Sequence, residues 1–266
     1  MRWREGRRSR ERPSSYRYLL DLDADLADEL DVRLRLAARP AVTAVTFDVD
    51  PGEVNLDQWL ALAAHGPGLL VLDGVMAVSV RVGDRTAAEL VGAGDLLQAF
   101  DDEDEELLAC EIGHRALLPT RFAVLDLAFN ERIRPWPQIS DELLQRAARR
   151  SRRLGVQRAI ASQPRLDVRL ALLLWHLSAR WGRVEPGGLR LSVPLTHQLL
   201  GRLIGAERPS VSHALARLAH SGLVSGHGDE WHLHGSLDDQ LATMIEPPAR
   251  VEELATAIKS PLRGRA

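Results

Sequence analysis

The sequence predicts an α+β protein with an N-terminal antiparallel β-roll of the jelly-roll kind, a long central helix and a C-terminal winged helix-turn-helix. Three observations lead to this prediction. Short segments of alternating apolar and polar residues fill positions 42–127. A helical pattern follows the prolines at 135 and 137. Two short helices with a tight turn between them, and then a hairpin, lie between Leu189 and Gly235.

The N-terminal end is strongly basic. The first 17 residues hold seven arginines and two glutamates, with almost no apolar side chain before Tyr16. This composition predicts a disordered basic arm over 1–17. Leucines then recur near helical spacing between acidic residues, at Leu19, Leu22, Leu26 and Leu30. That spacing predicts a short amphipathic helix.

The β-roll domain is expected over 18–135. Its clearest strand patterns are the alternating apolar residues of 45–49 and 78–82. Turn residues punctuate the region at 51–52, 66–68, 73–74, 83–84 and 92–94. Short strands at such regular spacing are typical of an antiparallel sandwich or jelly roll rather than of a parallel sheet.

A long helix is expected over 138–162, where Ser140 is a suitable cap for the first turn. Its apolar positions form a narrow strip of Leu143, Leu144, Ala147, Ala148, Leu154 and Ala161. Arginines occupy the remaining surface: Arg146, Arg149, Arg150, Arg152 and Arg153. A narrow apolar strip is suited to pairing with its own copy across a two-fold axis, which predicts a dimerisation helix. Packing of the same strip on the β-roll is the alternative.

The helix-turn-helix lies in a domain expected over 165–237, followed by a tail over 238–266. Thr196 is a good N-cap for a helix ending at Ile204, and Pro209 suits the start of the next helix. Helical spacing buries Val211, Ala214, Leu215 and Leu218 and leaves Arg208, Ser210, Ser212, His213 and Arg217 facing outward. Such side chains can donate to phosphates or base edges in a major groove. The hairpin after Gly222 is the expected wing, in which Trp231 and Leu233 should point inward and His232 and His234 outward.

Residues 195–224, LTHQLLGRLIGAERPSVSHALARLAHSGLV, resemble the Crp/Fnr superfamily of bacterial transcription regulators. The resemblance extends over nearly the whole chain after the basic arm. It implies the same domain order, with a cyclic-nucleotide-type β-roll, a dimerisation helix and a winged helix. It also implies a homodimer that binds a palindrome in double-stranded DNA and contacts RNA polymerase. The longest apolar stretches, such as 170–177, are too short to span a bilayer, which predicts a cytoplasmic protein with no membrane partner.

Roles follow from this resemblance by position. Base reading is implied for Arg208, Pro209 and His213. Phosphate positioning is implied for Thr196, His197, Gln198, Ser210, Ser212 and Arg217. The wing tip is implied for Gly226, His227 and Gly228. Pro209 stands where the family has a base-reading glutamate, and proline offers no acceptor to a cytosine amino group, so the half-site should differ.

The family's cyclic-nucleotide cassette is degenerate in this chain. Gly94-Asp95 aligns with its start, but Gln98-Ala99 replaces the glycine–glutamate pair. The acidic run 101–106 that follows would repel a phosphate. Arg115 or Arg121 would have to replace the missing phosphate-binding arginine, and each reads more simply as a surface strand residue. We therefore expect that cyclic AMP is not used, and we identify no other cofactor.

Metal sites have little support in the sequence. Possible haem ligands are His65, Cys110 and His114, and possible zinc ligands are His227, His232 and His234. Neither set has the spacing of a known motif or a complete ligand set. We therefore expect no metal.

Enzymatic activity is not expected either, because the sequence has no nucleophile elbow, Walker loop, paired-histidine zinc helix or dinucleotide fingerprint. A net charge of -3 leaves a second function open. In that alternative the chain is a ligand-sensing or protein-partner adaptor whose winged helix contacts protein rather than DNA.

Overall fold

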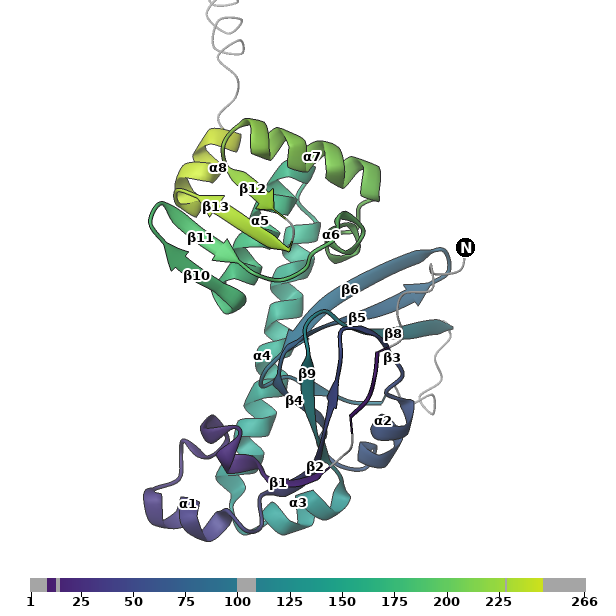
Figure 1. The fold of residues 1–266 in the computed structure, drawn as a ribbon, viewed down its shortest axis with the longest axis vertical. Coiled ribbons are helices and arrows are strands. Elements are labelled where there is room, and N and C mark those ends of the chain that lie inside the picture. Colours follow the sequence, from purple (N-terminus) through teal and green to yellow (C-terminus); the bar gives the residue numbers. More distant parts are fainter. Residues whose placement is uncertain (1–8, 13–14, 100–108, 228, 246–266) are drawn as a thin grey trace, which may run out of the picture.

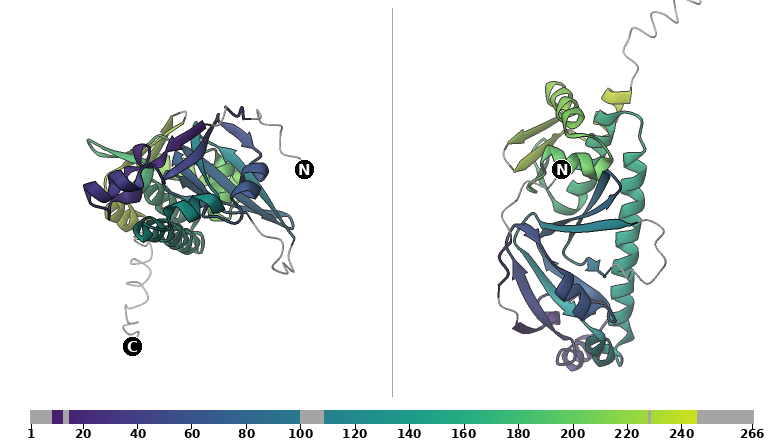
Figure 2. Two further views of the ribbon diagram at one scale, coloured as in Figure 1. Left: turned by 90° about the horizontal axis from the view of Figure 1, so that it is seen from below. Right: turned by 90° about the vertical axis from the view of Figure 1, so that its right-hand side faces the viewer.

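The computed structural model describes residues 9–12, 15–99, 109–227 and 229–245. A β-roll occupies one end of the molecule, and the winged-helix unit lies at the other end of the long helix α4 (Pro137–Ala161) (Figure 1). The side view shows α4 as one continuous helix along the flank of the roll (Figure 2). The predicted fold class is confirmed.

Two antiparallel sheets form the roll. The first has the order β1-β2-β9-β4-β7 and contains β1 (Ser15–Tyr18), β2 (Thr43–Val49), β9 (Thr120–Leu125), β4 (Gly68–Asp73) and β7 (Leu96–Leu97). The second has the order β3-β8-β5-β6 and contains β3 (Gly52–Val54), β8 (Cys110–Ala116), β5 (Val75–Val82) and β6 (Arg85–Gly92). Phe47 and Phe122 stack with ring centroids 5.1 Å apart in the core, together with Met76 of the second sheet.

Two short helices belong to the roll, α2 (Asp57–Ala63) and α3 (Leu127–Ile133). The expectation of strands alone over 42–127 is therefore wrong at α2. Leu56, Leu60 and Ala63 recur at helical spacing and are buried in the core. Seven residues give only two turns of this pattern, which the surrounding turn residues obscure in the sequence.

The prediction of a disordered arm over 1–17 is wrong for its described part. Ser15–Tyr18 forms β1 and pairs with β2, and Glu11 makes a bridge with Val49. Side chains add to this pairing, since Arg12 donates to Asp50 at 2.9 Å and Trp59 Nε1 donates to Glu11 at 2.8 Å. Backbone pairing with the edge of a sheet does not depend on apolar composition, so composition did not reveal it. Residues 1–8 and 13–14 lie outside the described part.

The leucine-rich segment after β1 is not the predicted continuous helix. It forms two 3₁₀ helices, Leu19–Asp21 and Ala24–Ala27, followed by α1 (Val32–Ala38). Asp31 caps α1 by accepting from the backbone N–H groups of Arg33 and Leu34. Aspartates compete for backbone donors and favour caps and turns over helix interiors, which explains the interruption.

The arginines of α4 do not simply cover its outer surface. Arg146 is 5% exposed and pairs with Asp23 and Glu142, and Arg150 pairs with Glu89 of β6. Leu143 from the predicted strip is buried among core residues of the roll. Leu144, in contrast, is 70% exposed. Part of the strip therefore packs on the β-roll, whereas pairing of its exposed residues with a second copy stays a prediction.

The winged-helix unit begins with α5 (Leu166–Trp181) and ends with α8 (Leu237–Ile245). Between them lie β10 (Gly182–Glu185), β11 (Gly188–Leu191), α6 (His197–Ile204), α7 (Arg208–His220), β12 (Val224–His227) and β13 (Glu230–His234). The strand order is β10-β11-β13-β12. Residues 237–245 are thus not a tail, because Gln240 is buried among hydrogen-bond partners. Its side-chain oxygen accepts from Trp175 Nε1, and its Nε2 donates to the carbonyls of Leu223 and His234. Residues 246–266 lie outside the described part.

Candidate nucleic-acid interface

The first helix of the motif, α6, starts where the sequence predicted. The Thr196 hydroxyl accepts a hydrogen bond from the Leu199 backbone N–H at 3.2 Å. Leu199, Leu200 and Leu203 face the core of the winged-helix unit. Gly205 ends the helix in the left-handed conformation, with φ of 68°.

The turn between α6 and α7 depends on a second glycine. Gly201 is buried, and a Cβ added there would lie 2.3 Å from the carbonyl oxygen of Ala206. The Ala206 N–H donates back to the Gly201 carbonyl at 2.8 Å. Only glycine permits this close approach of the two helices.

The second helix, α7, has one buried side and one exposed side. Its buried residues are the expected Val211, Ala214, Leu215 and Leu218. Arg208, Pro209, Ser210, His213 and Arg217 are exposed. Figure 1 shows α7 on the outside of the molecule, at the end away from the core of the β-roll. These five residues are therefore free to meet a partner.

Two of the residues assigned to phosphates contact each other. His197 Nδ1 lies 2.8 Å from Ser212 Oγ, and both side chains are partly buried. Gln198 and Thr196, near the start of α6, are exposed. The structure thus places Ser212 inside the α6–α7 contact rather than on the free surface of α7.

A groove of about 460 Å³ lies between the start of α6, the side of α7 and the wing. Its lining residues are Leu195, Thr196, His197, Ser212, Leu215, Ala216, Ala219, Val224, Gly226, Asp229 and Trp231. Trp231 is the residue that sequence reasoning assigned only to the core. Its Nε1 is buried and has no hydrogen-bond partner among the described residues.

The wing is the hairpin of β12 and β13. Trp231 and Leu233 of β13 point inward as predicted. Gly226 lies against the indole, because an added Cβ would be 3.2 Å from the Trp231 ring. Gly228 and the side chain of His227 lie outside the described part, so their role at the wing tip stays a prediction.

The region aligned with the nucleotide cassette is only partly described. Asp95 is buried and accepts from the Gly92 N–H at 2.9 Å. Arg115 pairs with Glu53 and Arg121 pairs with Asp48, both near the surface. The whole acidic run 101–106 lies outside the described residues. The absence of cyclic-nucleotide binding therefore stays a prediction.

The histidines considered as haem ligands, His65 and His114, lie on different elements, whereas His232 and His234 lie on the same strand, β13. His114 is half-buried on β8, where burial lowers its pKa and Asp57 opposes that shift. His234 contacts Ser225 at 2.9 Å, and His65 is exposed after α2. Within residues 9–12, 15–99, 109–227 and 229–245, no group of three His, Cys, Asp or Glu side chains is arranged to hold a metal. Among the helices in that part, none combines the length and hydrophobicity of a bilayer span.

Comparisons with known proteins agree with this geometry. A family model described as a Crp-like helix-turn-helix domain matches residues 168–235. The chain is 30% identical over 196 residues to the CRP-like cAMP-activated global transcriptional regulator of Mycobacterium tuberculosis, which covers 69% of this chain and 84% of that relative. These proteins are transcription regulators rather than enzymes.

Solved structures show a similar fold at low identity. FixK2 from Bradyrhizobium japonicum matches with a TM-score of 0.56 and 16% identity, over 77% of this chain and 99% of that chain. A cyclic nucleotide-binding domain containing protein from Listeria monocytogenes EGD-e matches with a TM-score of 0.57 and 14% identity, over 71% and 88%. Each match covers a larger share of this chain than the winged-helix unit, so both likenesses extend beyond that unit.

Proposed function

The chain belongs to the Crp/Fnr superfamily of bacterial transcription regulators, and from this premise we propose that it is a homodimer that binds a specific palindromic sequence in double-stranded DNA. The observation that carries the proposal is the exposed N-terminal half of α7. Arg208, Ser210 and His213 lie there on a helix whose other side is anchored by buried leucines. A helix held in this way fits the major groove and presents donors to base edges.

Within this proposal, Arg208 and His213 read bases and Pro209 lies between base contacts without adding an acceptor. Arginine recognises guanine through two parallel hydrogen bonds, which makes Arg208 the strongest single determinant of sequence. A proline at position 209 removes the preference for cytosine that a carboxylate would give. The half-site is therefore expected to differ from that of relatives with glutamate at this position.

The DNA backbone is proposed to run along the groove between α6, α7 and the wing. Thr196 and Gln198 lie at the N-terminal end of α6, where backbone N–H groups and the helix dipole favour a phosphate. Arg217 extends the contact along α7, and the wing at Gly226 closes the other side. These contacts position the duplex, whereas α7 supplies sequence specificity.

The homodimer is proposed to form through the exposed side of α4. Leu144 is 70% exposed and Leu154 is 41% exposed, and Ala148 and Ser151 lie between them on the exposed side. Small residues between leucines allow two helices to approach closely. A two-fold axis along this face would present two α7 helices to half-sites about 34–36 Å apart.

The remaining features of the proposal concern partners and place. We propose that the regulator works without cyclic AMP, because the cassette at 94–99 lacks the glycine–glutamate pair. As a transcription regulator it acts on RNA polymerase at promoters in the cytoplasm. Whether it activates or represses depends on where its site lies relative to the promoter.

The test is a selection of bound fragments from random double-stranded DNA by the full-length chain, without added nucleotide. The proposal expects enrichment of one inverted repeat whose half-sites are one helical turn apart. No enrichment, together with salt-independent capture of a protein partner, would instead support the adaptor function.

A further inference from the structure

Asp95 occupies a fixed position in the turn between β6 and β7. Its carboxylate is 2% exposed, and Oδ2 accepts from the Gly92 N–H at 2.9 Å. Its backbone carbonyl accepts from the Val71 N–H, also at 2.9 Å. The β-roll therefore sets where this negative charge lies.

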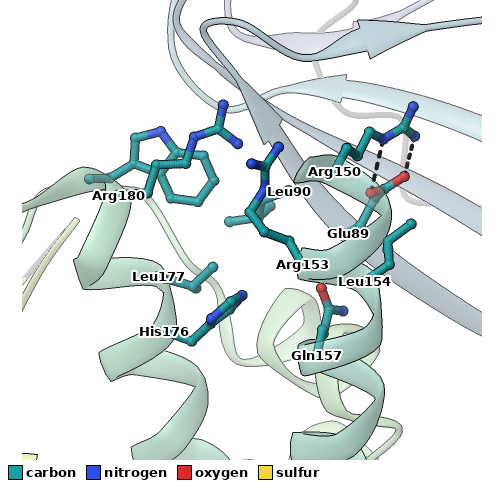
Figure 3. Close-up of a pocket in the computed structure, with 10 residues that line it drawn as sticks. Glu89, Leu90, Arg150, Arg153, Leu154, Gln157, His176, Leu177 and Arg180 are labelled. Carbon is teal, nitrogen blue, oxygen red and sulfur yellow. Dashed lines mark hydrogen bonds and ion pairs between the residues drawn. The ribbon is translucent and has the colours of Figure 1, made fainter. Parts of the chain in front are cut away.

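Two arginines from different helices meet this carboxylate. Arg153 of α4 donates to Oδ1, and Arg180 of α5 donates to Oδ2 at 2.6 Å. Arg180 also donates to the Ala93 carbonyl at 2.6 Å. Figure 3 shows the two guanidinium groups pointing toward one another from their two helices. Asp95 thus connects the roll, α4 and the first helix of the winged-helix unit.

The charge balance makes Asp95 necessary at this junction. Arg150 is compensated by Glu89, whereas Arg153 and Arg180 share Asp95. Burial lowers the pKa of Arg153, Asp95 opposes this shift, and the positive charge of Arg180 adds to it. Without an anion between them, two partly buried like charges would separate, and α5 would move away from α4.

Other contacts at the junction join α4 and the β-roll to the winged-helix unit. Gln157 of α4 donates to the Ala88 carbonyl at 2.7 Å and to the Leu203 carbonyl of α6 at 2.9 Å. The Trp181 ring lies so close to Gly92 that an added Cβ would be 3.1 Å away. Because α5, α6 and α7 share one hydrophobic core, a displacement of α5 at Asp95 would also displace α6 and α7.

We propose that Asp95 is a built-in counter-anion that positions the winged-helix unit on the β-roll, so that the orientation of α7 is set without a bound effector. Asp95 is a positioning residue in this account, because it acts through Arg153 and Arg180 and does not touch DNA. The proposal rests on the proposed DNA-binding function. It adds that the charge holding the two arginines together comes from the protein itself.

Glu89 provides a matched control. It lies on β6 next to the same junction, is 15% exposed and forms its ion pair with Arg150 of α4. E89Q removes one negative charge and one contact between the roll and α4, as D95N does. It leaves the contact between the roll and α5 in place.

The experiment measures affinity for the selected DNA fragment, without added ligand, for the wild type, D95N and E89Q. D95N is expected to bind roughly 5- to 150-fold more weakly, the usual range of coupling between sites. E89Q is expected to stay close to the wild type. Equal affinities for D95N and the wild type, or an equal loss in E89Q, would overturn the proposal.

A second experiment measures the DNA affinity of D95G with and without sodium formate. D95G leaves space between the two arginines for a small carboxylate such as formate. Formate is expected to restore much of the DNA affinity of D95G and to leave D95N unchanged. A purely structural role in the turn would not respond to formate, so failure of rescue in a folded D95G chain counts against the proposal.

Hydrogen exchange separates this proposal from the proposed function. D95N is expected to exchange faster than the wild type at 88–97 and 176–185, with α7 itself unchanged. Faster exchange in a chain whose wild type binds no DNA would support the junction and refute the DNA-binding function. Unchanged exchange at both segments would refute the junction whatever the DNA result.

Discussion

His197 and Ser212 join the two helices of the helix-turn-helix through a contact of 2.8 Å between Nδ1 and Oγ. The Ser212 hydroxyl also donates to the Arg208 carbonyl at 3.1 Å. With its proton used there, the oxygen accepts from the Nδ1–H of His197. The contact thus links the N-terminal turn of α6 to the first turn of α7, where the proposed base-reading residues lie.

Replacing Ser212 by alanine should therefore affect both stability and DNA binding. We expect S212A to lose about 0.5–1.5 kcal/mol of unfolding free energy, the usual net value of one hydrogen bond. DNA affinity should also fall, because α6 and α7 no longer hold a fixed relation. Urea denaturation and a gel-shift titration measure the two effects. S210A, at an exposed position on the same helix, should leave the unfolding free energy unchanged. An equal loss of unfolding free energy in both variants would argue against the contact.

Alanine substitutions at two helical glycines should change the free energy of unfolding in opposite directions. G201A places a Cβ 2.3 Å from the Ala206 carbonyl oxygen, so the α6–α7 turn must shift. We expect G201A to lose about 1–3 kcal/mol of unfolding free energy. At Gly155 of α4 an added Cβ would meet no described atom within 4 Å, and G155A should gain roughly 0.5–1 kcal/mol from helix propensity. Thermal unfolding of both variants checks the contrast, which a stable G201A would contradict.

The exposed side of α4 should determine oligomeric state. L144E introduces a charge at a residue that is 70% exposed in the single chain and would be buried between the two helices of the proposed dimer. We expect light scattering to show a shift from dimer to monomer. L62E changes a similarly exposed leucine on α2, at 54%, and should leave the dimer intact. A dimeric L144E chain would show that the subunits meet elsewhere.

Acid should weaken the fold through His176 on α5. Burial lowers the pKa of His176, and the neighbouring Arg153 lowers it further. The unfolded chain therefore takes up a proton that the folded chain does not as pH falls below 6.5, the ordinary value. The contribution of neutral His176 to the unfolding free energy should thus be complete above that pH and decrease below it. H176Q should reduce this decrease between pH 6.5 and about 5, measured by urea denaturation of both chains across that range; an equal decrease in H176Q would contradict the role of His176.

The winged helix could be predicted in detail because its signals are local. Thr196, Gly205 and Pro209 mark where helices begin and end, and the apolar positions of α7 repeat at helical spacing. Each of these signals acts within a few residues, so one sequence is sufficient to read it. The exposure of Arg208 and His213 followed directly.

The features that were missed depend on contacts between distant segments. The order at Ser15–Tyr18 comes from pairing with β2, and Asp95 meets Arg180 across 85 positions of sequence. Arg146 carries no local sign that it is buried against Asp23. A partial signal for the junction was present in the density of arginines on α4, which exceeds what a solvated helix surface needs.

The contribution of Arg208 to sequence specificity tests the whole account most directly. The measurement is a fluorescence anisotropy titration of the selected palindrome and of its variants at each base pair, for the wild type, R208A and H220A, whose change lies at the far end of the same helix. We expect R208A to lose about 1–3 kcal/mol of discrimination at one symmetric pair of positions, and H220A to retain it. Unchanged discrimination in R208A would show that the start of α7 does not read DNA.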